Sequence, residues 1–367
     1  MKKFFFIVLL WFVSQPIFAQ IYDNGVRYEF ISDDELEVVS YGSSKRHVDL
    51  EIPAYFVIDG YRYYVTSIAN RAFANCENLE SITLPSKVTV IGNDAFSRCT
   101  NLYNVVLPSS LVSIGERVFM ECTSLTSIKI PKKVETIGFG AFLNCENLSS
   151  VFLPSSVEEI GGYAFSNCKS LKTIKLPNYL HVLEYRMFSG CDSLHDVTLP
   201  KYVREICYYA FGDCLSLDSI SIPKSIREIE YYAFKGCPSL KKVVLEPNIY
   251  TVKIGKEAFG ECDSLSEFHC LTTKPPVGKD EPFSSYNATL YVPCQSKSEY
   301  ETNEIWSNFS MIECEDPLSV ENITQDDAPE SIYDVQGREI PNLQKGLNIV
   351  KFKNGNTEIL YLNSGLR

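Results

Sequence analysis

The sequence predicts a solenoid, in which short coils of similar sequence stack on one another, because one apolar pattern recurs through its middle. Eight phenylalanines are spaced by 23 residues, and a ninth follows after 25 residues. A cysteine stands three residues after each phenylalanine, and a leucine three residues after each cysteine. Self-similarity at a fixed period of roughly 20–50 residues is the signature of a repeat fold. The nine phenylalanines are Phe73, Phe96, Phe119, Phe142, Phe165, Phe188, Phe211, Phe234 and Phe259.

Each unit has the apolar spacing of a leucine-rich repeat. In the first unit, Leu79, Ile82 and Leu84 form the L-x-x-I-x-L pattern, and Pro85 ends the strand because it has no N–H to donate. One unit cannot enclose its own apolar side chains, so stacking is needed to bury them as continuous ladders. We therefore expect a right-handed α/β-type stack of coils with mostly short parallel strands. A single helical turn is expected before each phenylalanine, as at 93–96.

The repeat unit AFxxCxxLxxIxLPxxVxxIG resembles the BspA-type (treponemal) leucine-rich repeat of bacterial surface proteins. Residues 67–270 contain about nine such units. The resemblance implies an exported protein similar to adhesins and to host-matrix or interbacterial binding proteins. Some later units depart from the pattern, because Glu184, Cys207 and Glu230 replace the turn glycine and Glu246 displaces the proline. These departures affect the expected turn geometry, but not the fold.

The N-terminus, residues 1–19, has the features of a secretory signal. Lys2 and Lys3 precede an apolar run from Phe4 to Val13, and Ala19 offers a small residue for cleavage. A run of this length is short for the hydrocarbon core of a bilayer, which favours a cleaved signal over a retained anchor. We expect a secreted or outer-surface protein that is not inserted in the membrane once the signal is removed.

Both ends of the repeat are expected to be capped. Residues 20–66 contain alternating apolar stretches and likely turn glycines, so they predict an N-terminal β-cap. Residues 271–316 predict a C-terminal cap with a strand at Thr289–Pro293, a short helix and a final strand. The polar, acidic stretch 317–330 is typical of a linker.

Residues 331–367 predict a small β tail. Its Asn354-Gly355 pair is a strong hairpin signal. The pattern YDVQGRxI…GLNIVKF…G resembles the C-terminal sorting domains of the Por-type secretion pathway, which would imply delivery to the cell surface. The last residues, 363–367, lack the usual basic-apolar finish of those domains, so a plain structural tail is the alternative.

Charge and histidine content argue against several classes of function. The formal charge is −12, and loss of Lys2 and Lys3 with the signal would bring it to −14. Such an acidic chain without a Lys/Arg run has no general attraction for nucleic acid. The four histidines, expected on the solvated surface, form no catalytic constellation and no zinc-binding spacing with cysteine. We therefore expect no enzymatic activity, no cofactor and no metal. These histidines are His47, His181, His195 and His269.

The nine repeat cysteines are expected to be small buried side chains. Adjacent coils place them about 4.8 Å apart with parallel side-chain directions, which does not suit a disulfide. Cys207 lies outside this ladder, as do Cys270, Cys294 and Cys314. The sequence leaves open whether the last three include one disulfide.

Two sets of exposed side chains are candidates for ligand binding. The first set consists of aromatic residues two or three positions before the repeat phenylalanine, which stacking would align along one edge. Tyrosine suits an interface because it combines apolar area with a hydroxyl group. The alternative is that these rings pack on neighbouring coils. The set is Phe139, Tyr163, Tyr185, Tyr208, Tyr209, Tyr231 and Tyr232.

The second set points outward from the predicted strands onto the open, concave face of the sheet. Its varied chemistry is what a recognition surface needs, and also what an unconstrained surface shows. The candidates are Tyr103, Lys129, Phe152, Lys172, Lys175 and His195. We interpret the chain as a cell-surface or secreted protein that mediates protein binding or adhesion, with host matrix or another cell surface as partner. A structural surface component without a discrete ligand and a carbohydrate-capture module are the alternatives.

Overall fold

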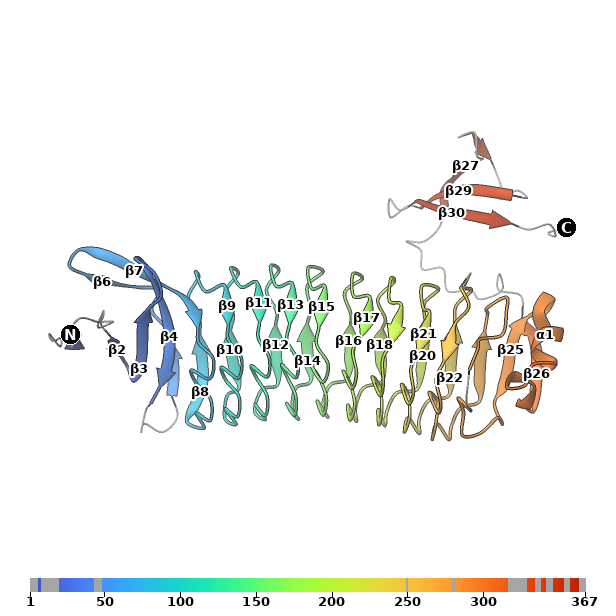
Figure 1. The fold of residues 1–367 in the computed structure, drawn as a ribbon, viewed down its shortest axis with the longest axis horizontal. Helices are drawn as coiled ribbons and strands as arrows, with labels where there is room; N and C mark the ends of the chain where they lie inside the picture. Colours follow the sequence, from blue (N-terminus) through green and yellow to red (C-terminus); the bar gives the residue numbers. More distant parts are fainter. Residues whose placement is uncertain are drawn as a thin grey trace, which may run out of the picture. The chain divides into compact units, whose positions relative to one another are not determined.

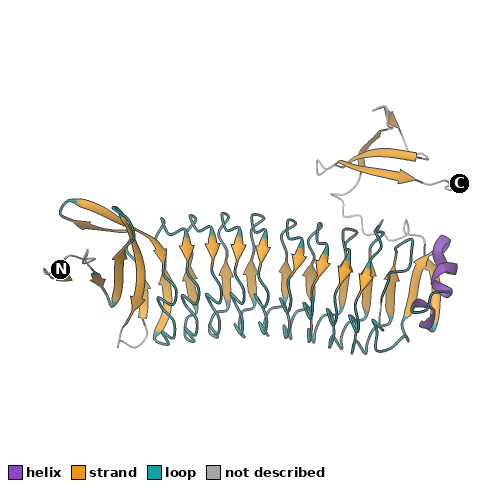
Figure 2. Cartoon of the chain, in the orientation of Figure 1, coloured by secondary structure: helices purple, strands orange, loops and turns teal. Residues whose placement is uncertain are grey.

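The computed structural model describes residues 6–7, 20–42, 48–248, 250–278, 281–315, 329–333, 338–340, 346–352 and 357–362. The chain forms two compact units, Met1–Glu315 and Asp316–Arg367. The first unit is an elongated stack of coils with β-structure at its N-terminal end and a short helix at its C-terminal end (Figures 1 and 2). The predicted solenoid is therefore confirmed.

Each coil contributes one strand to each of two rows. The strands of row A follow the repeat leucine, and the shorter strands of row B follow the turn after the proline (Figure 1). Paired strands within a row are parallel and in register from coil to coil, as in Ile82↔Val105 and Ile91↔Ile114. Row A contains β8 (Leu79–Thr83), β10 (Asn104–Val106), β12 (Ser127–Lys129), β14 (Ser150–Phe152), β16 (Thr173–Lys175), β18 (Asp196–Thr198), β20 (Ser219–Ile222), β22 (Lys242–Leu245) and β24 (Glu267–Cys270). Row B contains β9 (Val90–Ile91), β11 (Ser113–Ile114), β13 (Thr136–Ile137), β15 (Glu159–Ile160), β17 (Val182–Leu183), β19 (Glu205–Ile206), β21 (Glu228–Ile229) and β23 (Lys253–Ile254).

The interior is built from ladders of identical side chains. Successive repeat phenylalanines are buried and stacked, with ring centroids 5.0 Å apart for Phe73 and Phe96 and 5.6 Å apart for Phe165 and Phe188. The repeat cysteines are free thiols, and from the second coil on each is buried. Each of these buried thiols donates to the carbonyl of the phenylalanine one coil earlier, as Cys99 Sγ does to Phe73 O at 3.0 Å. Burial raises the pKa of Cys99 to about 12. The ladder is thus structural, as expected.

The turn before each phenylalanine is not the helical turn that the sequence suggested. Asp94 and Arg98 both have positive φ, 56° and 62°, which no helix contains. Backbone N–H groups instead donate to the next coil, from Asp94 to Glu116 at 2.8 Å and from Phe96 to Val118 at 2.9 Å. Left-handed residues two positions before and after the phenylalanine turn these groups along the stack. Coils are therefore hydrogen-bonded to each other at this edge as well as in the rows.

The left-handed position before the phenylalanine recurs in nine successive coils. None of its occupants is β-branched, in keeping with the steric cost of positive φ for such side chains. They are Arg71, Asp94, Arg117, Gly140, Tyr163, Arg186, Tyr209, Tyr232 and Glu257.

The N-terminal end extends the two rows unequally. Row B continues from β9 into a mixed sheet that buries Tyr28 and Phe56 over the first coil. Row A gains only β5 (Val48–Glu51), which pairs with β8 and has no second strand neighbour among the described residues. The sheet strands are β1 (Phe6–Ile7), β2 (Ile21–Asp23), β3 (Val26–Phe30), β4 (Glu35–Tyr41), β6 (Tyr55–Ile58) and β7 (Tyr61–Ile68). Apart from residues 6–7, the predicted signal lies outside the described residues.

The C-terminal end continues the coil pattern instead of interrupting it. Phe283 stacks on Phe259 at 5.5 Å, and β25 (Thr289–Pro293) and β26 (Met311–Glu315) extend row A in parallel. The strand expected at Thr289–Pro293 is found with those bounds. The other elements are η1 (Cys294–Ser296), α1 (Lys297–Glu301) and η2 (Trp306–Asn308). None of the helices in the described part of the chain is long and apolar enough to cross a bilayer.

A disulfide closes the last two strands. It joins Cys294, just after β25, to Cys314 in β26. Cys270 stays reduced and buried, with its Sγ 3.3 Å from Tyr300 Oη. The pairing that the sequence left open is therefore Cys294 with Cys314.

The second unit contains a small antiparallel sheet in the order β28-β27-β29-β30. The last two strands pair around residues 353–356, so they form the predicted hairpin, although the Asn354-Gly355 turn lies outside the described residues. Most of the predicted linker also lies outside them. The strands are β27 (Pro329–Tyr333), β28 (Glu339–Ile340), β29 (Gly346–Phe352) and β30 (Thr357–Leu362).

Candidate functional site

Six of the seven predicted aromatic residues, a set here called the aromatic edge, form ring clusters beside the left-handed turns; Tyr231 has no ring contact among those of the described residues. In the first cluster, the Phe139 ring lies 5.4 Å from Tyr163 and 6.2 Å from Tyr185. Tyr163 and Tyr185 meet edge to face at 5.5 Å and 87°. Residues from three successive coils are thus brought together, as the 23-residue spacing predicted.

Arg186 connects this cluster to a second one. Its guanidinium carbon lies 5.8 Å from the Tyr163 ring, 5.7 Å from Tyr208 and 4.8 Å from Tyr209. Tyr208 in turn contacts Tyr209 at 5.7 Å and Tyr232 at 5.8 Å. A guanidinium at these distances is attracted by the ring faces. Arg186 was not among the predicted site residues, because it is not aromatic. Its sequence signal is that it occupies the repeat position of Tyr163 and Tyr209.

Small residues and a hydrogen bond fix two of these rings. A Cβ placed on Gly162 would lie 2.9 Å from the Tyr185 ring, so this ring rests directly on the Gly162 backbone. The Tyr209 ring covers Gly212 in the same way, and its hydroxyl donates to Asp213 Oδ2 at 3.1 Å. Burial and the Asp213 carboxylate raise the pKa of Tyr209 to about 12, so the phenol keeps its proton at neutral pH. These two rings are therefore held in place by contacts within the chain.

Exposure divides the aromatic edge into two parts. Tyr185, Tyr208 and Tyr231 expose 42%, 38% and 52% of their surface. The remaining members are partly buried against neighbouring coils: Phe139, Tyr163, Tyr209 and Tyr232. The inner rings thus pack against neighbouring coils, and the outer rings are exposed to solvent.

The residues predicted on the open face all lie on the solvent side of row A. Phe152 is 72% exposed and Tyr103 is 51% exposed. Phe152 in β14 is the register partner of Lys129 in β12. Lys172, Lys175 and His195 are exposed as well. The strands bring Lys129, Phe152 and Lys175 into one line across three coils, whereas Tyr103 and His195 lie in the two flanking coils at the repeat position of Lys172.

A group of possible metal ligands lies where the turn glycine is replaced. One ligand atom each from Glu205, Cys207 and Glu230 lie within 4.8 Å of one another. Burial, followed by the carboxylates of Glu230, Glu205 and Glu184, raises the pKa of Cys207 to about 12. The thiol therefore keeps its proton at neutral pH, and a metal would have to displace this proton to bind the sulfur. This group was not predicted, and its sequence signal is the 23-residue spacing of residues 207 and 230.

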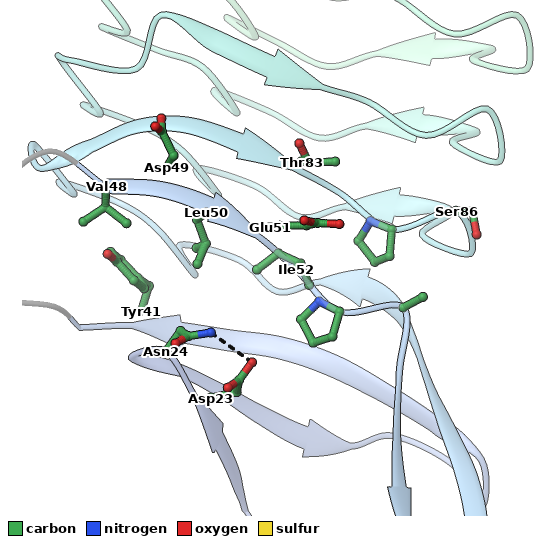
Figure 3. A pocket seen from close by; sticks show the side chains of 13 residues that line it. Asp23, Asn24, Tyr41, Val48, Asp49, Leu50, Glu51, Ile52, Thr83 and Ser86 are labelled. Carbon is green, nitrogen blue, oxygen red and sulfur yellow. Dashed lines mark hydrogen bonds between the residues drawn. The ribbon is translucent and has the colours of Figure 1, made fainter. Parts of the chain in front are cut away.

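A hollow of about 700 Å³ lies beside β5, between the N-terminal sheet and the first coil (Figure 3). Asp23 and Asn24 border it from the β2–β3 turn, and Asn24 Nδ2 donates to Asp23 Oδ2 at 3.3 Å. Asp49 and Glu51 of β5 also line it, and its lining within the described residues contains no histidine, cysteine, lysine or arginine. The hollow was not predicted, because it depends on where row A ends.

One histidine departs from the expectation of a solvated surface. His269 is buried, with 8% of its surface exposed, and its ring stacks on Tyr291 at 4.5 Å. Its Nδ1 lies 2.6 Å from Glu315 Oε2 and its Nε2 lies 3.1 Å from Glu267 Oε2. The prediction was wrong here because β25 and β26 continue row A and cover this side chain. His181 and His195 are exposed, as predicted, and His47 lies outside the described residues.

Comparisons with known proteins agree with the repeat pattern. A family model described as the BspA type leucine-rich repeat region matches residues 66–195 and 158–287, in six copies. No curated protein matches the chain. The tail after residue 287 is not part of the family match.

Solved structures of bacterial leucine-rich-repeat proteins are similar to the chain. A leucine-rich repeat protein of T. pallidum is 30% identical, over 59% of this chain and 88% of that one, with a TM-score of 0.47. A leucine-rich repeat protein from Bacteroides ovatus is 22% identical, over 80% of this chain and 99% of that one, with a TM-score of 0.52. The second comparison supports the fold.

Proposed function

Because the chain belongs to the BspA-type leucine-rich-repeat family, we propose that it is a surface protein that binds another protein through its aromatic edge. The family and its fold are repeat scaffolds that are typically non-enzymatic. The signal-like residues 1–19 support export, and the tail resemblance supports sorting to the outer surface. Protease treatment of intact cells expressing the full chain, compared with a chain lacking residues 331–367, tests the location and the role of the tail.

The single observation that carries the binding proposal is the row of exposed tyrosines, Tyr185, Tyr208 and Tyr231, with Arg186 against the Tyr208 ring. Tyrosine and arginine are enriched among residues that dominate binding energy at protein interfaces. Tyr185 and Tyr208 already contact rings of neighbouring coils, so little of their side-chain entropy would be lost on binding. A rigid aromatic surface of this kind favours recognition over a purely structural role.

The tilt of the rings favours a protein partner over a carbohydrate. Tyr163 and Tyr185 meet at 87°, and Tyr208 and Tyr232 meet at 86°. Such rings share no common plane on which successive sugar rings could stack. Rings at such angles, with the Arg186 guanidinium against Tyr163 and Tyr208, suit the protruding side chains of a protein.

A pair of double variants tests the proposal. We expect Tyr208→Ser with Tyr231→Ser to weaken binding to a partner from a panel of extracellular-matrix proteins by about 30-fold or more, since hot-spot side chains each carry about 2 kcal/mol or more. Tyr179→Ser with Tyr202→Ser is the matched control, because these tyrosines are also exposed, by 58% and 46%, but lie in the turn after row A. Both variants should melt like the parent chain.

The outcomes separate the alternatives. Equal losses in the two double variants would refute the assignment of the aromatic edge. Binding on a glycan array that disappears only with the Tyr208 and Tyr231 changes would show carbohydrate capture instead. The absence of binding on both the protein panel and the array would favour a structural surface component.

A further inference from the structure

Row A carries a cationic patch on an otherwise acidic protein. We define the lysine–phenylalanine face by Lys129, Phe152, Lys172 and Lys175. Lys129 and Phe152 are register partners in β12 and β14, and Lys175 has the same position in the neighbouring β16. Since adjacent strands are about 4.8 Å apart, a lysine flanks the exposed ring on each side at one strand spacing.

This face is free of carboxylates over three coils. Nine outward positions of β12, β14 and β16, each strand taken with the residue before it, hold three lysines, one phenylalanine and five hydroxyl residues. The positions are Thr126, Ser127, Lys129, Ser149, Ser150, Phe152, Lys172, Thr173 and Lys175. Acidic residues of the same coils lie instead in the turns before row A, at Glu121 and Glu146, and along row B and just before it, at Glu135, Glu158 and Glu159. The two rows therefore differ in charge, against a total of −12.

The three lysines are available to an external anion. None of them forms an ion pair in the described part of the chain, whereas Lys169 pairs with Glu146 at 2.9 Å and Lys242 with Glu267 at 3.2 Å. Phe152 has no ring partner among the described aromatic contacts and is 72% exposed. An unpaired cluster of cations around an uncovered ring is complementary to a ligand with anionic and apolar groups close together.

We propose that the lysine–phenylalanine face binds an acidic polypeptide segment in which carboxylates flank an apolar side chain. The strands of row A already pair with their neighbours, so the segment is recognised through side chains and not as an added strand. The apolar side chain covers Phe152, and the carboxylates meet the lysines on either side. A long uniform polyanion is disfavoured because the net negative charge of the whole protein repels it.

This face lies on a different segment of each coil from the aromatic edge. It follows the repeat leucine, whereas the aromatic edge precedes the repeat phenylalanine. Binding of the acidic segment should therefore not depend on Tyr208 and Tyr231, and the serine variants at those positions should not change its affinity.

The test uses the full mature chain and fluorescence anisotropy with a labelled 12-residue peptide of glutamates and interspersed leucines and phenylalanines. We expect saturable binding that weakens several-fold between 50 and 300 mM NaCl, because salt screens exposed charges. The same peptide with glutamine in place of glutamate should bind at least about tenfold more weakly. Heparin and single-stranded DNA serve as probes for the two other kinds of polyanion.

Matched variants locate the site. Joint replacement of Lys129, Lys172 and Lys175 by Glu should lower affinity by about 30-fold or more, and Phe152→Ser by about fivefold to tenfold. Lys241→Glu is the control, because Lys241 is also exposed and has the repeat position of Lys172 three coils further on, with no ion pair described for it; it should change affinity less than twofold.

Each contrary result overturns the proposal. The proposal fails if the acidic peptide shows no saturable binding at 1 mM. It also fails if Lys241→Glu lowers the affinity as much as the triple lysine replacement does, because this would show unspecific attraction. Tighter, lysine-dependent binding of heparin or DNA would show a polyanion site instead. If Phe152→Ser binds the peptide as tightly as the parent chain, the proposed contact between Phe152 and an apolar side chain of the ligand is wrong.

Discussion

Replacing one central phenylalanine of the ladder should destabilise the solenoid severely. Phe165 is fully buried between Phe142 at 5.4 Å and Phe188 at 5.6 Å. Phe165→Ala forfeits about 1.5–3 kcal/mol of transfer free energy. If a cavity of about 80 Å³ remains, a cost of about 24 cal/mol per Å³ adds about 2 kcal/mol. The free energy of unfolding should thus fall by about 3.5–5 kcal/mol.

Full collapse of that cavity is opposed by the backbone. The N–H of Phe165 donates to Met187 O at 3.0 Å, and the N–H of Phe142 donates to Ala164 O at 2.8 Å. These bonds keep adjacent coils at their spacing, so the neighbouring rings cannot close the gap. The cost should therefore lie at the upper end of the range known for such substitutions, about 3–5 kcal/mol.

Urea unfolding measured by circular dichroism and by Trp306 fluorescence tests this reasoning. Stability in a solenoid is propagated between neighbouring coils, so a weakened central coil should uncouple the two halves. The two signals should then separate in Phe165→Ala, since Trp306 is buried in the C-terminal coils. Phe152→Ala, which removes an equally large but exposed ring, should cost less than about 0.5 kcal/mol. Similar losses in both variants would refute the proposed ladder energetics.

Two further predictions concern charge and the disulfide. Burial and nearby carboxylates raise the pKa of Glu205, so its favourable contribution to stability is present below its unfolded pKa and is lost as pH rises through the folded value. Glu205→Gln should therefore raise the free energy of unfolding at pH 7 by up to about 1 kcal/mol after solvent screening, but not at pH 3.5. Equal gains in calorimetry at both pH values would contradict this. The bond between Cys294 and Cys314 closes a separation of 20 residues, so its reduction should cost about 3 kcal/mol in the C-terminal coils, seen as earlier unfolding of Trp306 in dithiothreitol. A variant with serine at both cysteines should not respond to dithiothreitol, and an indifferent parent chain would exclude the bond.

The coils could be predicted from sequence because their burial depends on a fixed spacing. A one-residue slip would move a whole ladder of phenylalanines or leucines out of the core, so the 23-residue period determines the coil. The last coils follow the period less closely: Phe283 comes 24 residues after Phe259, and Tyr286 stands where a cysteine is expected. Phe283 was therefore assigned to a cap, although its ring continues the ladder.

The turn geometry was not predictable from the apolar pattern. Arg117 and Arg186 give no sign in their own chemistry of the left-handed φ values, 52° and 53°, that the structure assigns them. Those values follow from the bonds between coils, which exist only after stacking. The burial of His269 was missed for a related reason, because β25 and β26 cover it from more than 20 residues away along the chain.

For the aromatic edge, the 23-residue spacing predicted which rings meet. The backbone conformation indicates the free-energy cost of placing a tyrosine at the left-handed position. Gly140 takes the left-handed position at φ 59° without a side-chain penalty, whereas Tyr163, Tyr209 and Tyr232 take it at 57°, 56° and 61°. A non-glycine residue there costs about 1–2 kcal/mol. Packing of the inner rings offsets part of this cost, but glycine or asparagine would meet the backbone requirement more cheaply. Arginine, aspartate and glutamate bear the same cost in other coils, so the backbone does not distinguish the tyrosines. The exposed tyrosines that they support are the reason to search for a partner at this edge.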